Sequence, residues 1–257
     1  FAGDGRKVAP AVQDATEALF VSPALSVASA CAPGPVRDRG ASAERAYLAS
    51  LDLPGAPLTG RLIVVDPAAG AAFRVLPAAI EAAGARVVVS CAAPDGRNIN
   101  AQCGAVHPGA LAARVLAERA FGGVAVDGDG DRVAIVDERG VVHDGDAILG
   151  LLTARWARMG TLRGGAVVGT KTSNSGLARF VVARGLRLLR ADVGDRYVSA
   201  MMEEHGCNLG GEGSGHVLTP DLCPTGDGTR VALLVLEAAV AEGCALSELF
   251  AAIPADP

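Results

Sequence analysis

Three aspartates alternate with glycines in the segment from Asp127 to Arg132, directly after an apolar run at residues 124–126. In an extended loop such carboxylates project to one side, and the glycines let the backbone bend closely around an ion. Oxygen ligands favour Mg²⁺, which keeps coordination positions open for water or a substrate phosphate. We therefore predict that Asp127, Asp129 and Asp131 bind Mg²⁺.

Three other interpretations of this acidic loop stay open at this point. A calcium EF-hand would use the same aspartates and Glu138 at its last position, but Arg132 stands where that loop needs glycine. A haloacid-dehalogenase-like phosphatase also has two aspartates after an apolar strand, but Asp131-Arg132 stands where it needs threonine or valine. A solvated acidic turn is the third, although close carboxylates repel one another without a positive neighbour.

A second loop, Gly210 to His216, carries one carboxylate, one hydroxyl and one imidazole among glycines. These groups are suitable donors and acceptors for neighbouring sugar hydroxyls. Glu212, Ser214 and His216 are therefore candidate substrate-binding residues, and the alternative is a glycine-rich turn with incidental polar side chains.

Other polar residues stand at predicted element boundaries. Asp195 is predicted to cap a helix, and the next residue, Arg196, is a candidate ligand contact. The segment from Thr225 to Gly228 either presents N–H groups to an anion or is an ordinary helix start. Lys171 follows a predicted strand and is a candidate for phosphate contact or proton transfer, with a solvated lysine as the alternative.

Strand and helix patterns alternate along most of the chain, which is typical of crossover units on parallel sheets. The pattern predicts two consecutive three-layer α/β/α domains with mainly parallel sheets. We expect residues 1–45 to be a remnant of a preceding domain plus a linker, residues 46–158 a metal-binding domain, and residues 159–257 a sugar-binding domain. The predicted strands are residues 62–66, 86–90, 124–126, 133–136, 141–143, 166–168 and 186–189. The predicted helices are residues 12–20, 76–83, 111–120, 148–158, 177–183, 197–204 and 229–241.

Composition excludes several classes of partner. The 257-residue chain has a formal net charge of -5 and no Lys/Arg cluster, which argues against nucleic acid and anionic membranes because both need a basic face. The six cysteines form no C-x-x-C pair, so their spacing predicts neither a zinc site nor a disulfide framework, and reduced thiols are expected. No apolar run approaches the roughly 20 residues of a membrane helix. We predict a cytoplasmic protein with a small-molecule substrate.

Taken together and in this order, four motifs resemble the α-D-phosphohexomutase family. They are residues 127–132, 194–198, 210–216 and 224–228. The stretch from Pro94 to Asn100, with Cys103-Gly104, is similar to the phosphoglucosamine mutase branch of the family. Phe1 to Lys7 resembles the end of that branch's first domain.

The resemblance implies a four-domain enzyme in which a phosphoserine of the first domain exchanges its phosphoryl group with the sugar. This chain would hold the second and third domains, and the first and fourth would be missing. Asp127, Asp129 and Asp131 would be the Mg²⁺ ligands, and Arg132 would lie beside the phosphoserine and sugar. In the other loop, Glu212 and Ser214 would bind sugar hydroxyls beside His216.

The implied reaction is the interconversion of glucosamine 6-phosphate and glucosamine 1-phosphate, so the expected partner is a phosphorylated hexosamine. No Ser-His-Asn stretch like the family's nucleophile loop occurs here, so we expect the chain alone to be inactive. Gly213 stands where the family has a larger polar residue, and Lys171 resembles the phosphomannomutase pattern. A phosphomannomutase or phosphoglucomutase, or a non-catalytic module that binds metal and phosphosugar, is the alternative.

Overall fold

The computed structural model describes residue 3 and residues 8–22, 38–53 and 55–254. Phe1, Ala2 and the segment 4–7, whose sequence resembles the end of a first domain, lie outside the described residues, as does most of the predicted linker. Contacts divide the chain into two units, residues 1–47 and 48–257. The first unit contains the predicted N-terminal helix, α1 (Pro10–Phe20), and most of α2 (Gly40–Ser50).

A five-stranded sheet forms the first half of the second unit, in the order β2-β1-β3-β4-β5. The first three strands in this order are mutually parallel, and β4 and β5 are antiparallel to their neighbours. The bounds are β1 (Leu62–Asp66), β2 (Arg86–Val89), β3 (Gly122–Val126), β4 (Val133–Asp137) and β5 (Val142–His143). The predicted strands are confirmed, with the predicted crossover helices between them.

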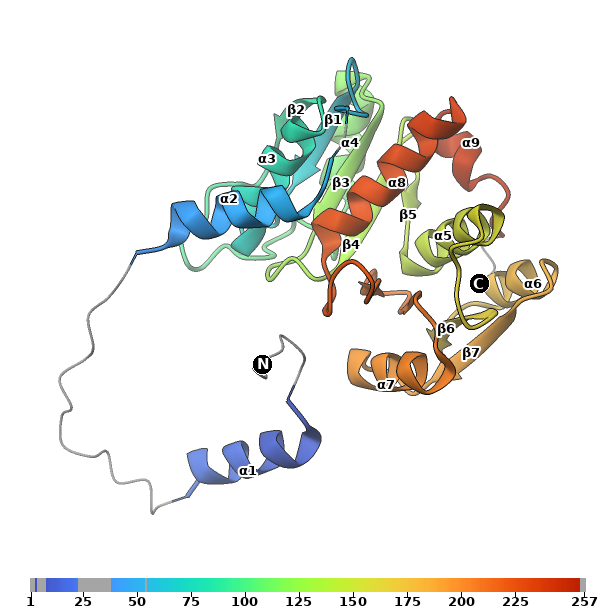
Figure 1. Ribbon diagram of the computed structural model, residues 1–257. Coiled ribbons are helices and arrows are strands. Elements are labelled where there is room, and N and C mark those ends of the chain that lie inside the picture. Colours follow the sequence, from blue (N-terminus) through green and yellow to red (C-terminus); the bar gives the residue numbers. More distant parts are fainter. Residues whose placement is uncertain (1–2, 4–7, 23–37, 54, 255–257) are drawn as a thin grey trace, which may run out of the picture. The chain divides into compact units, whose positions relative to one another are not determined.

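Helices cover both faces of this sheet. On one face α4 (Gly109–Glu118) buries Leu111 and Val115 against Val64, Ala125 and Val136. The short helix η1 (Ala71–Phe73) leads into α3 (Val75–Ala82), which contacts β1, β2 and α8 (Gly228–Glu242), while α8 contacts β3 and β4 (Figure 1). Because strand residues alternate between faces, the apolar runs of β1 and β3 supply a core to each layer.

A four-stranded sheet forms the second half, in the order β7-β6-β8-β9. Only its last pair is antiparallel. Its strands are β6 (Ala166–Thr170), β7 (Arg187–Ala191), β8 (Gly210–Gly211) and β9 (Val217–Leu218), and its helices are α5 (Gly145–Met159), α6 (Ser175–Val182) and α7 (Asp195–His205). On α7, Val198 and Met202 pack against Ala166 and Val168 of β6. Two mixed sheets, each with three parallel strands and helices on both faces, confirm the predicted α/β class.

The helices α5 and α8 do not pack on the sheets that they follow in the chain. The helix α5 follows the first sheet but packs on β6, β8 and α6 of the second, whereas α8 follows the second sheet and packs on the first. This exchange joins the two sheets within one unit.

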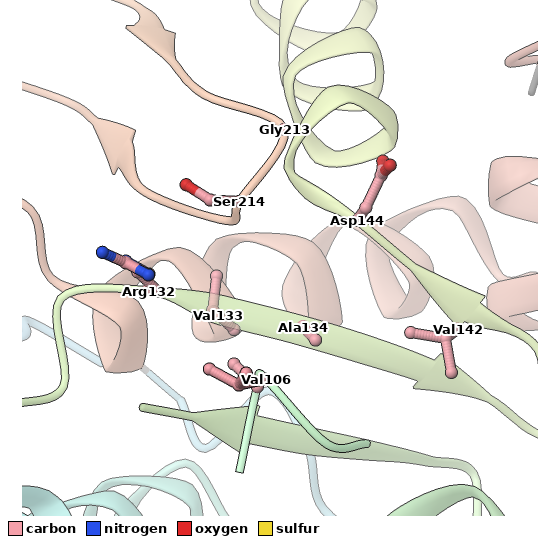
Figure 2. Close-up of a pocket in the computed structure, with 9 residues that line it drawn as sticks. Val106, Arg132, Val133, Ala134, Val142, Asp144, Gly213 and Ser214 are labelled. Atoms are coloured by element: carbon pink, nitrogen blue, oxygen red, sulfur yellow. The ribbon is translucent and has the colours of Figure 1, made fainter. Parts of the chain in front are cut away.

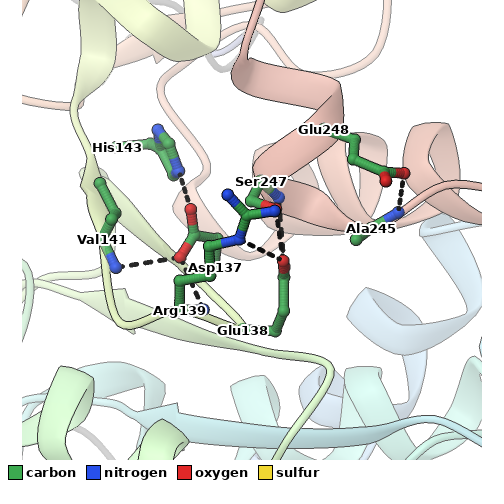
Figure 3. Close-up of polar contacts among 8 residues, drawn as sticks. All are labelled: Asp137, Glu138, Arg139, Val141, His143, Ala245, Ser247 and Glu248. Atoms are coloured by element: carbon green, nitrogen blue, oxygen red, sulfur yellow. Dashed lines mark hydrogen bonds and ion pairs between the residues drawn. The ribbon is translucent and has the colours of Figure 1, made fainter.

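A hairpin between β4 and β5 makes polar contacts with a segment far along the chain (Figure 3). Buried Asp137 accepts hydrogen bonds from the backbone N–H groups of Arg139 and Val141, both at 2.9 Å, and lies 3.0 Å from His143 Nε2. The adjacent Glu138 accepts a 3.1 Å hydrogen bond from the N–H of Ser247 and another from its hydroxyl. Ser247 belongs to α9 (Leu246–Phe250), so the hairpin holds the last described helix.

One local prediction is wrong. Asp195 does not cap α7: the N-cap is Gly194 at φ 124°, with no side-chain cap hydrogen bond, and Asp195 is the first helical residue. A glycine can take this backbone angle without steric cost, so the helix starts without a polar cap. None of the described helices is long and apolar enough to cross a bilayer.

A seam of backbone contacts joins the first strand after the acidic loop to the glycine-rich loop. Arg132 forms an antiparallel bridge with His216, and the Val133 N–H donates to the Gly215 carbonyl at 3.1 Å. Gly215 has φ 95°, and a Cβ added there would lie 2.3 Å from the Val133 carbonyl oxygen. Only glycine allows this approach.

Gly215→Ala is expected to lower the free energy of unfolding by about 2 to 4 kcal/mol. The substitution forces alanine into a left-handed backbone angle. Its Cβ also clashes with the Val133 carbonyl, which cannot rotate away as a side chain could. Urea denaturation followed by circular dichroism measures the change.

Gly213→Ala is the matched control in the same loop, since its added Cβ would meet no atom nearer than 3.6 Å. It should change the unfolding free energy by less than about 0.5 kcal/mol, as for an ordinary surface substitution. Equal stability of the two variants would contradict the seam as described.

Candidate functional site

The acidic loop joins two antiparallel strands. Val126 at the end of β3 pairs with Val133 at the start of β4, so the aspartates lie in the connection between them. Gly130 turns the chain at φ 82°, and its N–H donates to the Asp127 carbonyl at 3.1 Å. Strands on both sides exclude an EF-hand, and Glu138, its would-be last ligand, binds Ser247 instead.

The three carboxylates converge. One oxygen of each of Asp127, Asp129 and Asp131 lies within 4.8 Å of the others. Asp127 is 6% exposed, whereas Asp129 is exposed and Asp131 half-buried. Burial raises the pKa of Asp127 and the neighbouring Asp131 and Asp129 charges raise it further, against a lowering hydrogen bond from the Arg132 N–H. The loop therefore concentrates negative charge at a site that is buried at Asp127 and open to solvent at Asp129.

Two basic side chains border the carboxylates. Arg132 Nε lies 3.6 Å from Asp127 and 3.9 Å from Asp131. On the other side, buried His216 places Nδ1 3.2 Å from Asp131 Oδ2. The Arg132 contacts are longer than hydrogen bonds, and His216 hydrogen-bonds to one carboxylate oxygen of Asp131, so these contacts do not occupy every oxygen of the three carboxylates.

His216 also faces the start of α7. Its Nε2 lies 3.6 Å from Asp195 Oδ2. Burial acts to lower the pKa of His216, but the hydrogen bond and charge of Asp131 outweigh it. The charges of Asp195 and Glu212 add to this effect, and the net pKa is raised. The ring thus links the acidic loop, the glycine-rich loop and α7.

The donor set fits a hard divalent cation. Three carboxylate oxygens at this separation match the oxygen ligands that Mg²⁺ prefers, with room left for water or a phosphate oxygen. Burial first, and then the charges of Asp131 and Asp129, raise the pKa of Asp127, so a cation among the carboxylates would stabilise its ionised form.

In the glycine-rich loop, Glu212 and Ser214 differ in their surroundings. Glu212 Oε1 accepts a 2.8 Å hydrogen bond from the Gly194 N–H at the start of α7, which fixes its carboxylate. Ser214 is exposed and shares with Arg132 the lining of a pocket of about 260 Å³. Their side chains lie on the same side of this pocket (Figure 2). The pocket brings one expected sugar contact beside the acidic loop.

The remaining predicted residues lie after β6 and at the starts of α7 and α8. Lys171 Nζ, at the end of β6, lies 2.5 Å from Asp192 Oδ1, with both side chains exposed. The Arg196 guanidinium stacks 4.7 Å from the Tyr197 ring and donates to its hydroxyl at 2.8 Å. Asp227 caps α8 by accepting from the Arg230 N–H at 3.0 Å, so this segment is an ordinary helix start.

Two neighbours of the acidic loop were not identified as site residues from the sequence. A Cβ at Gly128 would meet Ile99 at 2.7 Å and Asn100 Nδ2 at 2.8 Å. These side chains therefore pack directly on the acidic loop. Gly128 also accepts a 2.8 Å hydrogen bond from the Ala71 N–H. The unusual Asn-Ile-Asn stretch at residues 98–100 was the sequence feature that could have identified them. Only the fold shows that this stretch lies against the acidic loop.

Known proteins resemble the chain in family, in sequence and in fold. Residues 144–256 match the family model of phosphoglucomutase/phosphomannomutase, alpha/beta/alpha domain III. The chain is 51% identical over 182 residues to a phosphoglucosamine mutase of Phenylobacterium zucineum, covering 71% of this chain and 40% of that protein. The corresponding enzyme of Paracoccus denitrificans is 51% identical over 197 residues, covering 77% and 44%. The chain thus spans under half the length of these relatives.

Solved structures show the same fold. A phosphoglucomutase/phosphomannomutase family protein from Burkholderia thailandensis matches with a TM-score of 0.72 and 27% identity, over 83% of this chain and 47% of that one. An N-acetylphosphoglucosamine mutase of Aspergillus fumigatus, solved with GlcNAc-6P and magnesium, matches with a TM-score of 0.64 and 18% identity, over 83% and 54%.

The family match begins at Asp144, the N-cap of α5, and so includes the helix that packs on the second sheet. These relationships favour a mutase over the phosphatase interpretation of the chain. With the sequence motifs, the two α/β sheets and the identity to phosphoglucosamine mutases in agreement, the chain belongs to the α-D-phosphohexomutase family.

Proposed function

We propose that this chain supplies the metal-binding and sugar-binding parts of a phosphosugar mutase that interconverts glucosamine 6-phosphate and glucosamine 1-phosphate. The observation that carries the proposal is the seam between Arg132 and His216. This seam places the three aspartates of the acidic loop beside the glycine-rich loop, whose polar groups suit sugar hydroxyls. The 51% identity to phosphoglucosamine mutases supports glucosamine phosphate as the substrate.

In the proposed mechanism Asp127, Asp129 and Asp131 would hold Mg²⁺, and the bound ion would supply positive charge beside the transferring phosphoryl group. Arg132 donates to phosphate oxygens at the same place, since its exposed side chain lies beside Asp127 and also lines the pocket. His216 holds Asp131 from the buried side. The phosphoserine of this reaction is implied by the family resemblance.

Recognition of the sugar falls to the glycine-rich loop. Glu212 keeps one oxygen on the Gly194 N–H and offers the other to a sugar hydroxyl, while Ser214 offers its hydroxyl from the pocket wall. Arg196 and Lys171 are proposed to contact the ligand phosphate from the second sheet. The boundary between the metal-binding and sugar-binding domains, residues 158 and 159, stays a prediction, as does the cytoplasmic location.

One observation favours a second candidate. Lys171 follows the phosphomannomutase pattern, and a protein of the phosphoglucomutase/phosphomannomutase group is 27% identical to the chain over an alignment that covers 47% of that protein. A coupled assay of the full-length protein on glucosamine 6-phosphate, mannose 6-phosphate and glucose 6-phosphate compares the candidates. A larger kcat/KM for either neutral sugar would replace the glucosamine assignment, and turnover of none would leave a binding module.

Asp129→Asn should weaken Mn²⁺ binding, measured by electron paramagnetic resonance as a stand-in for Mg²⁺, by at least about 10-fold. Its exposed carboxylate contributes a ligand and a charge, and even outer partners of metal ligands contribute that much. Turnover should fall by about 100-fold or more because charge stabilisation at the phosphoryl group is lost.

Asp14→Asn is the control, because it makes the same change on α1, away from the acidic loop in sequence. It should leave both quantities unchanged. Unaltered Mn²⁺ binding by Asp129→Asn would exclude the metal assignment.

Glu212→Gln should raise the KM for glucosamine 6-phosphate by roughly 10- to 100-fold, the value of a hydrogen bond to a charged group. The amide oxygen can still accept from Gly194, so the loop keeps its shape. Steady-state kinetics measures the change. Glu81→Gln on α3 removes the same charge at an exposed position and should leave KM unaltered, and an equal effect of both variants would contradict a sugar contact.

Two single variants, Lys171→Gln and Asp192→Asn, are compared to test the role of Lys171. Both substitutions break the 2.5 Å ion pair, but only the first removes a group proposed to contact phosphate. We expect kcat/KM to fall by about 10-fold or more in Lys171→Gln alone, in line with loss of one charged contact. Equal kinetics in the two variants would show that the lysine serves only the ion pair.

A further inference from the structure

A second group of metal-ligating side chains lies outside the acidic loop. Asp66 ends β1, Cys91 follows β2, and Cys103 precedes α4. A carboxylate oxygen of Asp66 and the two Sγ atoms lie within 4.8 Å of one another. Asp66 is 1% exposed and Cys103 3% exposed, while Cys91 opens to solvent. The sequence spacing gave no sign of this group because its members come from three separate segments.

We propose that Asp66, Cys91 and Cys103 form a second cation site, which takes a thiophilic divalent ion of the Zn²⁺ type. Two thiolates and one carboxylate are a known kind of zinc donor set, whereas Mg²⁺ takes oxygen ligands. Tetrahedral bonds of about 2.0 to 2.3 Å place donor atoms roughly 3.5 to 3.8 Å apart. Small side-chain rotations therefore close the present arrangement around an ion.

The backbone already fixes the carboxylate. Asp66 Oδ1 accepts from the Ala68 N–H and Oδ2 from the Gly104 N–H, both at 2.9 Å. A carboxylate oxygen can accept more than one partner, so these bonds orient Asp66 as outer-sphere contacts orient ligands in known metal sites. The solvent side of Cys91 leaves a fourth position for water.

The negative charge of Asp66 favours a cation beside the two thiols. Burial first, and then the Asp66 charge, raises the pKa of Cys103 to about 11 and also raises that of Cys91. Thiols that resist ionisation react slowly with oxidants. A divalent ion reverses this balance: it displaces one proton from each thiol, bonds both sulfurs and neutralises the carboxylate that disfavoured the thiolates.

Backbone strain is concentrated at the same place. In the described part of the chain, eight non-glycine residues have positive φ, and five surround this group: Ala68, Ala69, Cys91, Asn100 and Gln102. Strained angles persist where the surroundings fix them and often mark sites of function. The Asn100 N–H also donates to the Ala68 carbonyl at 2.9 Å, so an ion here would tie the ends of β1 and β2 to the segment that packs on the acidic loop.

The test uses the full chain, reduced and stripped with a chelator, titrated with Cd²⁺ as a spectroscopic probe and with Zn²⁺ in competition. We expect a cadmium–thiolate absorption band that saturates at one ion per chain, release of two protons per ion, and no band with Mg²⁺. Cys91→Ser and Cys103→Ser should each weaken binding by more than the roughly 10- to 100-fold caused by losing an outer-sphere partner.

Two control variants distinguish binding at this site from binding elsewhere on the chain. Cys244→Ser removes a half-buried thiol far from Asp66 in sequence and should leave the titration unaltered, as should Asp129→Asn in the acidic loop. Because Cys91 is exposed, its serine variant folds even if that of buried Cys103 does not. Saturable binding that survives Cys91→Ser, or that is lost equally in Cys244→Ser, would overturn the proposal, as would the absence of a band in the parent chain.

Discussion

Mutual repulsion of three carboxylates is the constraint around which this part of the protein is arranged. Oxygens of Asp127, Asp129 and Asp131 are held within 4.8 Å of each other, on a loop too short to let them separate. The chain compensates with positive groups at a moderate distance, Arg132 on the open side and His216 on the buried side. Moderate distance matters, because tightly paired carboxylates would have no free oxygens for a cation.

Glycines make this arrangement possible by letting backbones approach where side chains would keep them apart. A Cβ at Gly145 would lie 2.0 Å from the Glu212 carbonyl oxygen, and one at Gly228 would lie 2.6 Å from that of Arg132. The start of α5 therefore reaches the glycine-rich loop, and the start of α8 reaches the end of the acidic loop. Binding groups from distant parts of the chain meet through main-chain contact, and their side chains remain available for a ligand.

Local patterns predicted much of the fold, but long-range placement was beyond them. The apolar runs of β1, β3 and β6 identified their strands, since buried parallel strands read as continuous hydrophobic segments. The strands β8 and β9 have two residues each, too few to show a period. Chain order also suggested that each helix stays with its own sheet, whereas α8 crosses to the first. The acidic loop was recognisable because its three aspartates are close together in the sequence, whereas Asp66, Cys91 and Cys103 come from three separate segments.

The contact between Glu138 and Ser247 has a mechanical consequence. It fastens α9 to the hairpin that follows the acidic loop, while α8 lies on the same sheet and the Val133–Gly215 hydrogen bond joins this sheet to the glycine-rich loop. Hinge motion needs a few loop or element-terminal residues that absorb the change in backbone angles. A hinge between the acidic loop and the glycine-rich loop would have to break the main-chain bond between Val133 and Gly215, so the two loops are mechanically coupled.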